Sequence, residues 1–482
     1  MPIISFAVQP FFKREKMPSD FAAQMAQSPY RTIWKLTWPQ ILMMVFHFFI
    51  GVADVWVAGK ISREVQASLG IITQSLFFML VVAVALANGA VAAISQSEGA
   101  GLHKRVQRYI GLCVLLGLLM GTLFMFLCLP IKDLLLTALQ VPAEMRSVTD
   151  YFFQVYLYVL PPYFMLIITN AVFRARKRVM QPLYCMVIVT TANTYLDLGL
   201  GLGWFGLPEI GFKGLAWATF GSVTAGAVFN LIVLFMRGDL GKGTLAPWRW
   251  IKKAMPYVVR VSWPAGLFQI VWHSGYLVLY AITASLPQGR IDALAGMAIG
   301  LRIESFLFLP AFAFNMTASI LTGHYLGARQ ADEARRFGLR ILGIGEIFII
   351  LFAMVLWQFM QPAVDIFTLD PAVGAQAMDY LWWNVLAIPF TLASMILAGA
   401  LNGAGATLWN MLIMGGATWF LRLPLAYMLG HEVMMVSTGI WIAMLCSQVV
   451  QSSTLLYVFK FRNWPKFAMF KDRNARITPN GA

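Results

Sequence analysis

The chain has little charge. Of its 482 residues, 12% are Asp, Glu, Lys or Arg, whereas 59% are hydrophobic, and the mean hydropathy is +0.71. About a quarter of the residues of a soluble globular protein are charged. A soluble chain of this length would also form several cores, each of which needs a polar surface. This composition cannot supply those surfaces, so a soluble globular protein is excluded.

Catalytic and metal-binding motifs are also missing from the sequence. It has no P-loop, zinc-ligand spacing or nucleophile elbow, so nothing in it supports ATP-driven transport within this chain. Its cysteines show no Cys-x-x-Cys or Cys/His spacing and predict neither a metal site nor redox chemistry. They are Cys113, Cys128, Cys185 and Cys446. A membrane-embedded enzyme would need a convergent nucleophile, metal or acid–base set, which does not appear. We therefore expect no enzymatic activity and no cofactor.

Long hydrophobic stretches dominate the sequence instead. A helix of about 20 apolar residues crosses the roughly 30 Å hydrocarbon core of a membrane, and twelve such stretches can be counted. They cover residues 38–59, 70–96, 108–130, 150–173, 181–204, 213–236, 257–286, 293–323, 337–360, 379–402, 408–430 and 435–459. The N-terminal charges follow a short apolar stretch, the wrong order for a cleaved signal peptide, so we expect the first span to direct insertion. The predicted fold is an all-α polytopic membrane protein with twelve transmembrane helices.

The basic residues predict how the chain is oriented. It has 36 Lys and Arg against 21 Asp and Glu. With the N-terminus in the cytoplasm, 28 of the 36 basic residues fall on the cytoplasmic side and 6 on the outer side, while Arg302 and Arg422 lie within spans. Cytoplasmic loops characteristically carry this excess of Lys and Arg. We therefore expect both termini in the cytoplasm, and nucleic-acid binding is not needed to explain the charge.

The sequence contains an internal repeat. LTWPQ at 36–40 returns as VSWPA at 261–265, an offset of 225 residues, and Asn88 returns as Asn315 at an offset of 227. Each copy holds six spans, so both begin on the cytoplasmic side and form a parallel repeat with a binding cavity expected between the halves. The basic, Pro- and Gly-containing segment 237–256 is the expected linker. The predicted parts are a cytoplasmic N-terminal segment 1–35, an N-lobe 36–236, the linker 237–256, a C-lobe 257–460 and a cytoplasmic tail 461–482.

Two carboxylates lie deep in the first half. Charged side chains inside a membrane are costly and usually face a cavity or a partner. Asp54 and Asp197 each lie 16 residues beyond the inner start of their spans, about 24 Å into the membrane. Asn193 shares a helix face with Asp197, and Thr219 reaches a similar depth from the outer side. The four residues predict one polar site. The alternative is that the carboxylates are solvated at the outer interface or paired with Lys213.

The second half lacks these carboxylates. At the repeat offsets, Leu279, Phe420 and Pro424 replace Asp54, Asn193 and Asp197, which argues against a symmetric structural role. Its own candidates for lining a substrate cavity are Trp272, His273, Arg302 and Glu304. Arg302 and Glu304 are two residues apart and cannot share a helix face. A structural ion-pair network for these two, and ordinary packing for the histidine, are the alternatives.

Several stretches taken together carry a family resemblance. They are Pro39, GVADVWVAG (51–59), AISQSEGAG (93–101), FRARKRVMQP (173–182), ANTYLD (192–197), KGLAWAT (213–219), GLRIESFLFLP and LTGHYLGA. In this combination the chain resembles the multidrug and toxic compound extrusion (MATE) family over about residues 30–460. The resemblance implies two six-helix lobes and export of organic, often cationic compounds by antiport with H⁺ or Na⁺.

The resemblance also implies roles for particular residues. Asp54, Asn193, Asp197 and Thr219 match the cation site of the N-lobe, where the coupling ion is H⁺, or Na⁺ held by Asp54, Asn193 and Asp197. Some branches of the family carry further acidic residues in the seventh and tenth helices. This chain has Trp272 and about Thr391 there, so it is more similar to the branch of the DNA-damage-inducible membrane protein.

The resemblance leaves one alternative within the wider superfamily. A flippase for a lipid-linked precursor would share the two lobes but is expected to have a strongly cationic cavity, and only Arg302 and Arg422 lie inside spans. The expected partners are a small organic substrate and membrane lipid, and we expect the chain to act as a monomer.

Overall fold

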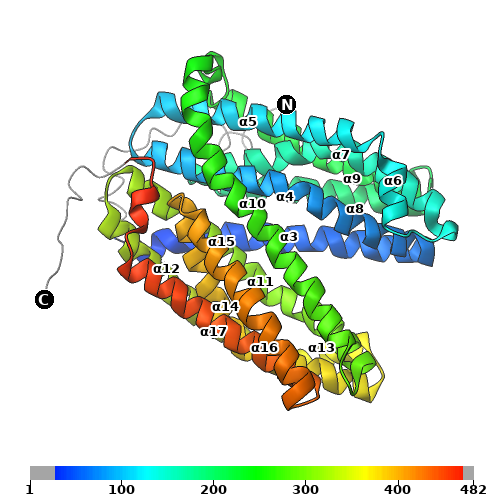
Figure 1. Ribbon diagram of the computed structural model, residues 1–482. Coiled ribbons are helices and arrows are strands. Elements are labelled where there is room, and N and C mark those ends of the chain that lie inside the picture. The colour runs from blue at the N-terminus through cyan, green and yellow to red at the C-terminus, as the bar shows by residue number, and fades with distance from the viewer. Residues whose placement is uncertain (1–27, 471–482) are drawn as a thin grey trace, which may run out of the picture. The chain divides into compact units, whose positions relative to one another are not determined.

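The computed structural model describes residues 28–470. The predicted N-terminal segment 1–35 lies outside the described residues except for its last eight, and so does most of the tail 461–482. Within the described part the chain is helical and has no strand (Figure 1). Twelve of these helices are long and apolar enough to cross a membrane, which confirms the predicted all-α fold with twelve spans.

The chain divides into two compact units, whose boundary falls between Val259 and Arg260. The short segment Glu98–Gly101 belongs to the second unit. Membrane helices of the first unit are α3 (Pro29–Ile61), α4 (Arg63–Gly99), α5 (His103–Cys128), α7 (Ala143–Ala175), α8 (Met180–Leu196) with the π-helix η1 (Asp197–Gly201), and α9 (Phe212–Met236). Short helices α6 (Lys132–Ala138), η2 (Trp204–Gly206) and η3 (Lys242–Thr244) connect them.

The second unit follows the same plan. Its membrane helices are α10 (Trp248–Ala284), α11 (Arg290–Gly327), α12 (Ala331–Trp357), α14 (Pro371–Gly403) and α17 (Ser437–Phe461), of which α10 begins in the first unit. The eleventh span, between α14 and α17, is made of four consecutive segments: α15 (Thr407–Gly416), η4 (Ala417–Arg422), α16 (Leu423–Tyr427) and η5 (Met428–Val433). Short helices are α13 (Met360–Phe367) and η6 (Trp464–Phe467). Helix α10 begins inside the segment 237–256 that the sequence indicated as a linker. Pro247 directly precedes its first turn, where the proline ring favours helix entry without costing a hydrogen bond.

Local sequence explains where the helices start and how they tolerate proline. Asp370 caps α14 by accepting a hydrogen bond of 2.9 Å from the Ala372 backbone N–H, and Pro371 occupies the first helical position. Pro39 in α3 and Pro389 in α14 lie inside their helices. Interior prolines are tolerated in membrane helices because neighbouring helices and polar side chains satisfy the freed backbone groups.

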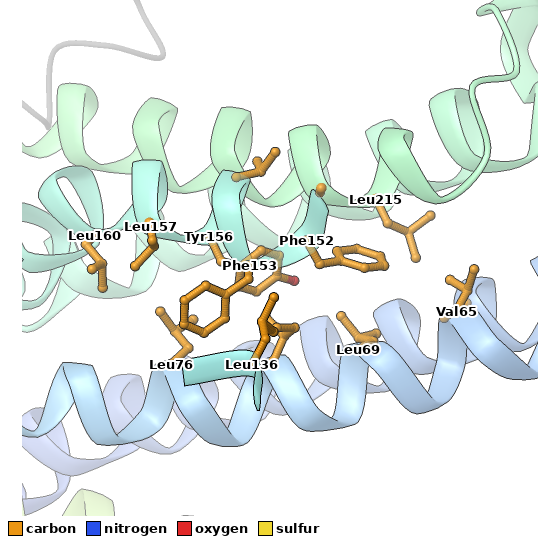
Figure 2. Packing of buried hydrophobic residues seen from close by; sticks show 14 of the residues in the cluster. Val65, Leu69, Leu76, Leu136, Phe152, Phe153, Tyr156, Leu157, Leu160 and Leu215 are labelled. Atoms are coloured by element: carbon orange, nitrogen blue, oxygen red, sulfur yellow. The ribbon is translucent and has the colours of Figure 1, made fainter. Parts of the chain in front are cut away.

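Apolar side chains hold the first unit together. Leu69 and Leu76 of α4 face Phe152, Phe153 and other residues of α7, as Figure 2 shows. The cluster also takes in α6 and α9 through Leu136 and Leu215. Phe152, Leu136 and Leu69 are each at most 2% exposed. This contact sets the orientation of α7, and with it the position of the side chains that α7 presents to α9.

Backbone contact between two helices organises the second unit. A Cβ atom on Gly399 of α14 would lie 2.2 Å from the Asn315 carbonyl oxygen of α11, and one on Gly403 would lie 2.0 Å from the Ser319 carbonyl oxygen. The two glycines are four residues apart and so share a helix face, as in the small-residue motifs of membrane helix pairs. Helices α11 and α14 therefore pack with their backbones touching, and any side chain on either glycine would separate them.

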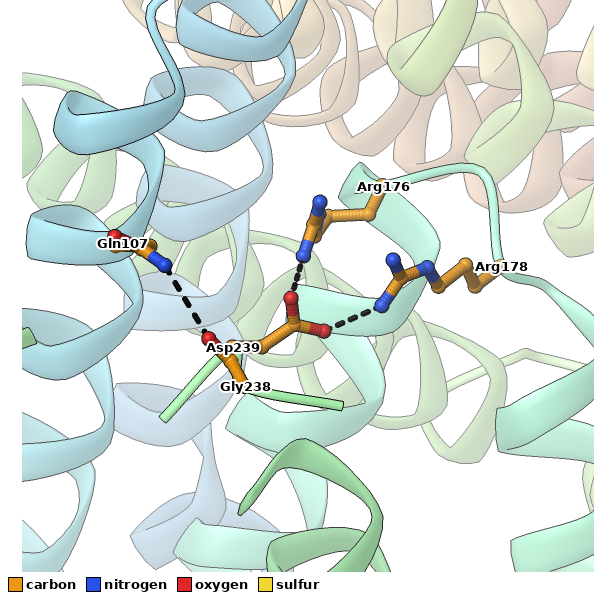
Figure 3. A network of polar contacts seen from close by, with 5 residues as sticks. All are labelled: Gln107, Arg176, Arg178, Gly238 and Asp239. Atoms are coloured by element: carbon orange, nitrogen blue, oxygen red, sulfur yellow. Dashed lines mark hydrogen bonds and ion pairs between the residues drawn. The ribbon is translucent and has the colours of Figure 1, made fainter. Parts of the chain in front are cut away.

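Polar contacts join two loops of the first unit. Asp239 accepts from both Arg176 and Arg178, which precede α8, and Gln107 Nε2 of α5 donates to the Gly238 carbonyl at 3.2 Å (Figure 3). Burial and the neighbouring Arg176 lower the pKa of Arg178, so the two guanidinium groups depend on this one carboxylate. The network ties the loop after α7 to the loop after α9.

Candidate functional site

The first unit brings three of the four predicted site residues into direct contact. Asp54 is on α3, Asn193 on α8 and Asp197 at the first position of η1. With the amide of Asn193 oriented so that its nitrogen faces the carboxyl groups, Nδ2 donates to Asp54 Oδ1 at 3.1 Å and to Asp197 Oδ2 at 3.2 Å. One side chain therefore bridges two carboxyl groups that are 143 positions apart in the sequence.

The two carboxyl groups differ in burial. Asp197 is fully buried, whereas Asp54 is only partly buried. The two are also within side-chain hydrogen-bond reach of each other. Carboxyl groups this close repel when both are ionised, and a proton or another cation between them removes the repulsion. Asp197 Oδ1 has no hydrogen-bond partner, so this buried oxygen is available to accept one.

A local change of helix type positions Asp197. At this residue α8 passes into η1, where the hydrogen bonds take the wider π-helical spacing. Such π-turns occur frequently at functional sites because they re-aim a side chain without ending the helix. Close packing holds η1 in place, since a Cβ atom on Gly214 of α9 would lie 2.5 Å from the Leu200 carbonyl oxygen. The start of α9 thus packs directly against the backbone that follows Asp197.

Thr219 joins the site through a tyrosine. Its hydroxyl donates to the Leu215 carbonyl at 3.2 Å and lies 3.4 Å from the hydroxyl of Tyr156 on α7. Because the Thr219 proton is directed to Leu215, Tyr156 is left as the donor to Thr219 Oγ1. Tyr156 is buried and interacts electrostatically with both Asp54 and Asp197. The hydroxyl pair therefore links α7 and α9 within the electrostatic reach of the two carboxyl groups.

Tyr156 was not among the residues predicted from the sequence. It is one of 15 tyrosines in the chain, and a tyrosine in an apolar helix usually packs in a core or lies at the membrane interface. Its ring is part of the apolar cluster between α4 and α7 (Figure 2), while its hydroxyl lies 3.4 Å from Thr219 Oγ1. The sequence has no signal that distinguishes this tyrosine, because the neighbours that define its role come from α3, α8 and α9.

The second-unit candidates lie in different surroundings. Glu304 is 3% exposed, and its Oε2 accepts a hydrogen bond of 2.6 Å from the Tyr380 hydroxyl. Trp272 and His273 of α10 are half-buried, and Arg302 is exposed. The Arg422 guanidinium lies 5.6 Å from the centre of the Trp272 ring. The structure thus separates Arg302 from Glu304. That these four residues line a substrate cavity stays a prediction.

Among the residues described, no three His, Cys, Asp or Glu side chains gather into a group that could hold a metal ion. The polar site of the first unit is built differently, from two carboxyl groups, an amide and two hydroxyls. Oxygen atoms of this kind are hard ligands and suit hard cations rather than the soft metals that thiolates bind.

Known proteins share both the sequence and the fold of the chain. The model of the MatE family matches residues 39–198 and 264–428. The probable multidrug resistance protein NorM of Thermotoga maritima is 28% identical over 447 residues, which cover 90% of this chain and 93% of that protein. The uncharacterized transporter YisQ of Bacillus subtilis is 22% identical over 444 residues, covering 90% and 94%.

Solved structures with low sequence identity have the same fold. A MOP superfamily transporter from Pyrococcus furiosus superposes with a TM-score of 0.85 at 19% identity and covers 94% of this chain and 99% of that one. An outward-facing multidrug resistance MATE family transporter gives a TM-score of 0.84 at 19% identity, covering 93% and 98%. The two stretches that match the family model begin 225 residues apart, at 39 and 264, which is the offset of the sequence repeat. The chain therefore belongs to the MatE family of transporters and is a multi-pass integral membrane protein.

Proposed function

We propose that the protein is a secondary active efflux transporter. It exports organic, cationic or amphipathic compounds in exchange for H⁺ or Na⁺ across the bacterial inner membrane, with both termini in the cytoplasm. Family membership supports transport, and the printed name of the Thermotoga maritima relative, a probable multidrug resistance protein, supports the substrate class. The observation that carries the proposal is the pair Asp54 and Asp197, bridged by Asn193 inside the membrane.

A proton fits this site in a simple way. Two adjacent carboxyl groups in a low-dielectric interior hold one proton between them more favourably than two negative charges. The partly buried Asp54 is the group that an external proton reaches first, and Asp197 behind it is fully buried. Asn193 Nδ2 stabilises the carboxylate that stays ionised. Capture and release of one proton then changes the charge of the site.

Sodium fits the same residues after one rotation. Turning the Asn193 amide by 180° directs its oxygen toward the point that its nitrogen occupies when it bridges the two aspartates. That oxygen, the carboxylate oxygens and Thr219 Oγ1 are the hard ligands that an alkali cation prefers. Among the carboxylate oxygens, Asp197 Oδ1 has no hydrogen-bond partner and is available to a cation. The site therefore supports either ion, and transport measurements must decide between them.

The transport cycle follows from the charge of the site. The substrate enters a central cavity from the cytoplasm or the inner leaflet, with Trp272, His273, Arg302 and Glu304 proposed to line its C-terminal side. After the lobes open outward, an external cation binds at Asp54 and Asp197. Neutralisation lets α3 bend and displaces the substrate, and the cation then leaves toward the cytoplasm. Alternating access of this kind needs no covalent step and no nucleotide.

Substitution of the two aspartates tests the proposal. Asp54→Asn and Asp197→Asn keep the size of each side chain but remove its charge, and each should abolish export of a cationic dye from cells while leaving the amount of protein in the membrane unchanged. Asp150→Asn is the matched control, because Asp150 pairs with Lys132 at 2.8 Å in the same unit and away from the site. Full export by both Asp54→Asn and Asp197→Asn would refute the coupling role.

Reconstitution into liposomes identifies the coupling ion and the class of substrate in separate measurements. Purified protein in liposomes should drive dye uptake with either a pH gradient or a Na⁺ gradient, and the effective gradient identifies the coupling ion. Movement of a labelled lipid-linked precursor in the same liposomes, without dye transport under either gradient, would show a flippase and contradict the proposal.

A further inference from the structure

Helix α10 is longer than a membrane crossing requires. It has 37 residues, Trp248–Ala284, which at about 1.5 Å per residue give a length of roughly 55 Å. The hydrocarbon core of a membrane is roughly 30 Å thick, and the apolar stretch of this span begins at residue 257. The first turns of the helix, 248–256, therefore project about 13 Å beyond the apolar stretch and pass through the region that lipid headgroups occupy.

Contacts with α5 fix the orientation of this segment. The Trp250 ring packs edge-to-face on Tyr109 of α5 with the centroids 4.9 Å apart, and the Arg108 guanidinium lies 5.8 Å from the centre of the Trp250 ring. A Cβ atom on Gly111 of α5 would lie 2.3 Å from the Thr244 carbonyl oxygen, so the loop that leads into α10 lies directly on α5. The face of α10 that carries Trp250 is therefore packed against the first unit.

The other face of the segment carries a tryptophan and three basic side chains, all exposed. They are Trp248, Arg249, Lys252 and Lys253. Their spacing of i, i+1, i+4 and i+5 places them on one side of a helix, whereas Ala254, on the side of Trp250, is only 4% exposed. Trp248 is 66% exposed, and Leu245, in the loop before the helix, is 84% exposed. These four side chains form a surface, called here the α10 basic surface, that has apolar groups beside its charges.

The described residues supply no acid to the α10 basic surface. From Gly241 to Arg260 the sequence has no Asp or Glu, and the acid just before this stretch, Asp239, already accepts from Arg176 and Arg178 (Figure 3). Within the part of the chain that the structure describes, the three basic side chains of the surface form no ion pair. Like charges one helical turn apart repel one another, and a bound anion removes that repulsion.

We propose that Arg249, Lys252 and Lys253 bind the phosphate headgroup of an anionic phospholipid, with Trp248 at the level of the headgroups beside it. The surface belongs to a helix that continues into a membrane span, so the anions it meets are those of the bilayer itself. A guanidinium pairs with two phosphate oxygens at once, while an ammonium acts as a point charge. Tryptophan side chains are enriched at this depth of the membrane.

The inference goes beyond the proposed function and does not depend on it. Clusters of basic residues directly next to a membrane span characteristically bind anionic lipids. Here the cluster is also held in one orientation by the packing of Trp250 on α5. A bound headgroup would therefore hold the start of α10, and with it this end of the first unit, at one level in the membrane.

Lipid binding to the full-length protein tests the inference directly. The protein is kept in a neutral detergent and titrated with phosphatidylglycerol or with phosphatidylcholine, and native mass spectrometry counts the lipids bound to each chain. The wild type should bind its first phosphatidylglycerol more tightly than phosphatidylcholine. One basic residue near an anionic headgroup is worth about a fivefold change in affinity, so Arg249→Gln/Lys252→Gln/Lys253→Gln should weaken the binding of phosphatidylglycerol about a hundredfold. The binding of phosphatidylcholine should not change.

A matched triple substitution controls for the loss of net charge. Lys60→Gln/Arg63→Gln/Arg290→Gln also removes three exposed basic side chains, but it leaves the α10 basic surface intact and should keep the affinity of the wild type. If the triple variant of the surface does not fold, Lys252→Gln alone should still weaken the binding of phosphatidylglycerol about fivefold. Arg249→Lys keeps the charge and should retain most of the binding.

Three outcomes would overturn the inference. The first is equal affinity of the wild type and the triple variant of the surface for phosphatidylglycerol, and the second is equal affinity of the wild type for phosphatidylglycerol and phosphatidylcholine. The third concerns the source of the phosphate. An excess of inorganic phosphate, compared with chloride at the same ionic strength, should leave the bound lipid in place. Complete displacement of the lipid by inorganic phosphate would show a site for a soluble anion instead.

Discussion

Asp54 and Asp197 come from different helices but accept hydrogen bonds from the same amide nitrogen, Asn193 Nδ2, at 3.1 and 3.2 Å. The bridge holds the two carboxyl groups at a fixed separation, with one of them partly accessible and the other buried. The geometry of the site therefore depends on a residue that carries no charge.

Asn193→Ala removes this bridge and leaves both carboxyl groups in place. A hydrogen bond to a charged group contributes about 1.5–3 kcal/mol, so loss of the bridge should shift the cation concentration for half-maximal transport by about tenfold or more. For H⁺ the concentration should fall, because the ionised carboxylates lose a donor, and for Na⁺ it should rise, because the ion loses the amide oxygen. Transport of a cationic dye into liposomes, measured against H⁺ or Na⁺ concentration, gives this value. Asn88→Ala is the control, because the Asn88 amide donates only to the Val84 carbonyl of its own helix. An unchanged half-maximal concentration would show that Asn193 does not shape the site.

Tyr156→Phe tests the contact between the Tyr156 and Thr219 hydroxyls. The substitution keeps the ring in the cluster with α4 but removes the group 3.4 Å from Thr219 Oγ1. A neutral hydrogen bond contributes about 1 kcal/mol, so apparent cation affinity should fall about fivefold while the folded protein stays intact. Tyr158→Phe is the matched control, since Tyr158 is on the same helix and bonds only to Gln154. Equal effects of the two substitutions would assign Tyr156 a packing role alone.

The membrane spans and the two deep acids could be predicted from the sequence for simple physical reasons. A lipid interior demands long apolar helices, so the twelve spans appear directly in the hydropathy. An acid inside such a span is conspicuous because its burial is costly, which is how Asp54 and Asp197 were found. Some observed helices begin before the predicted spans, as for Trp248–Ala284 against 257–286, because the helix takes in the polar, basic stretch that precedes the apolar one.

Tertiary neighbours explain what the sequence could not predict. In the sequence, Tyr156 cannot be distinguished from other tyrosines in apolar helices. Its role appears only when α7 packs against α9 and its hydroxyl comes to lie near Thr219. Glu304 accepts its hydrogen bond from Tyr380 on a distant helix, whereas sequence proximity favours Arg302. The π-turn at Asp197 depends on the close approach of Gly214, since the residues of the turn themselves, Asp-Leu-Gly-Leu-Gly, do not require it. In each case the deciding contact joins two different helices.

Gly214→Ala should disturb the site without touching a polar residue. Its Cβ would lie 2.5 Å from the Leu200 carbonyl oxygen and 2.9 Å from the Gly201 nitrogen, so α9 and η1 must separate. Overpacking of this kind costs about 1–3 kcal/mol, and the shift of η1 moves Asp197. We expect lower thermal stability in detergent together with reduced dye transport.

Gly221→Ala, on the same helix, provides the comparison. Its Cβ would meet only Leu196 Cδ1 at 3.4 Å, an ordinary contact, and alanine is the better helix former by about 0.5–1 kcal/mol. Stability and transport should therefore be unchanged or slightly improved. If Gly214→Ala behaves like Gly221→Ala, close packing at η1 does not control the position of Asp197.

Asp239→Ala should destabilise the end of the first unit at which the loops after α7 and α9 meet. Asp239 is 5% exposed and accepts from both Arg176 and Arg178, so its removal leaves two partly buried guanidinium groups that repel each other. Breaking a buried ion pair in this way costs about 3 kcal/mol, whereas Glu333→Gln, which breaks the exposed pair between Glu333 and Arg336, should change stability by less than about 1 kcal/mol. Unfolding of the purified variants in detergent, followed by circular dichroism, measures both. Equal stability of Asp239→Ala and Glu333→Gln would mean that the loops after α7 and α9 are held by other contacts, such as the bond between Gln107 and Gly238.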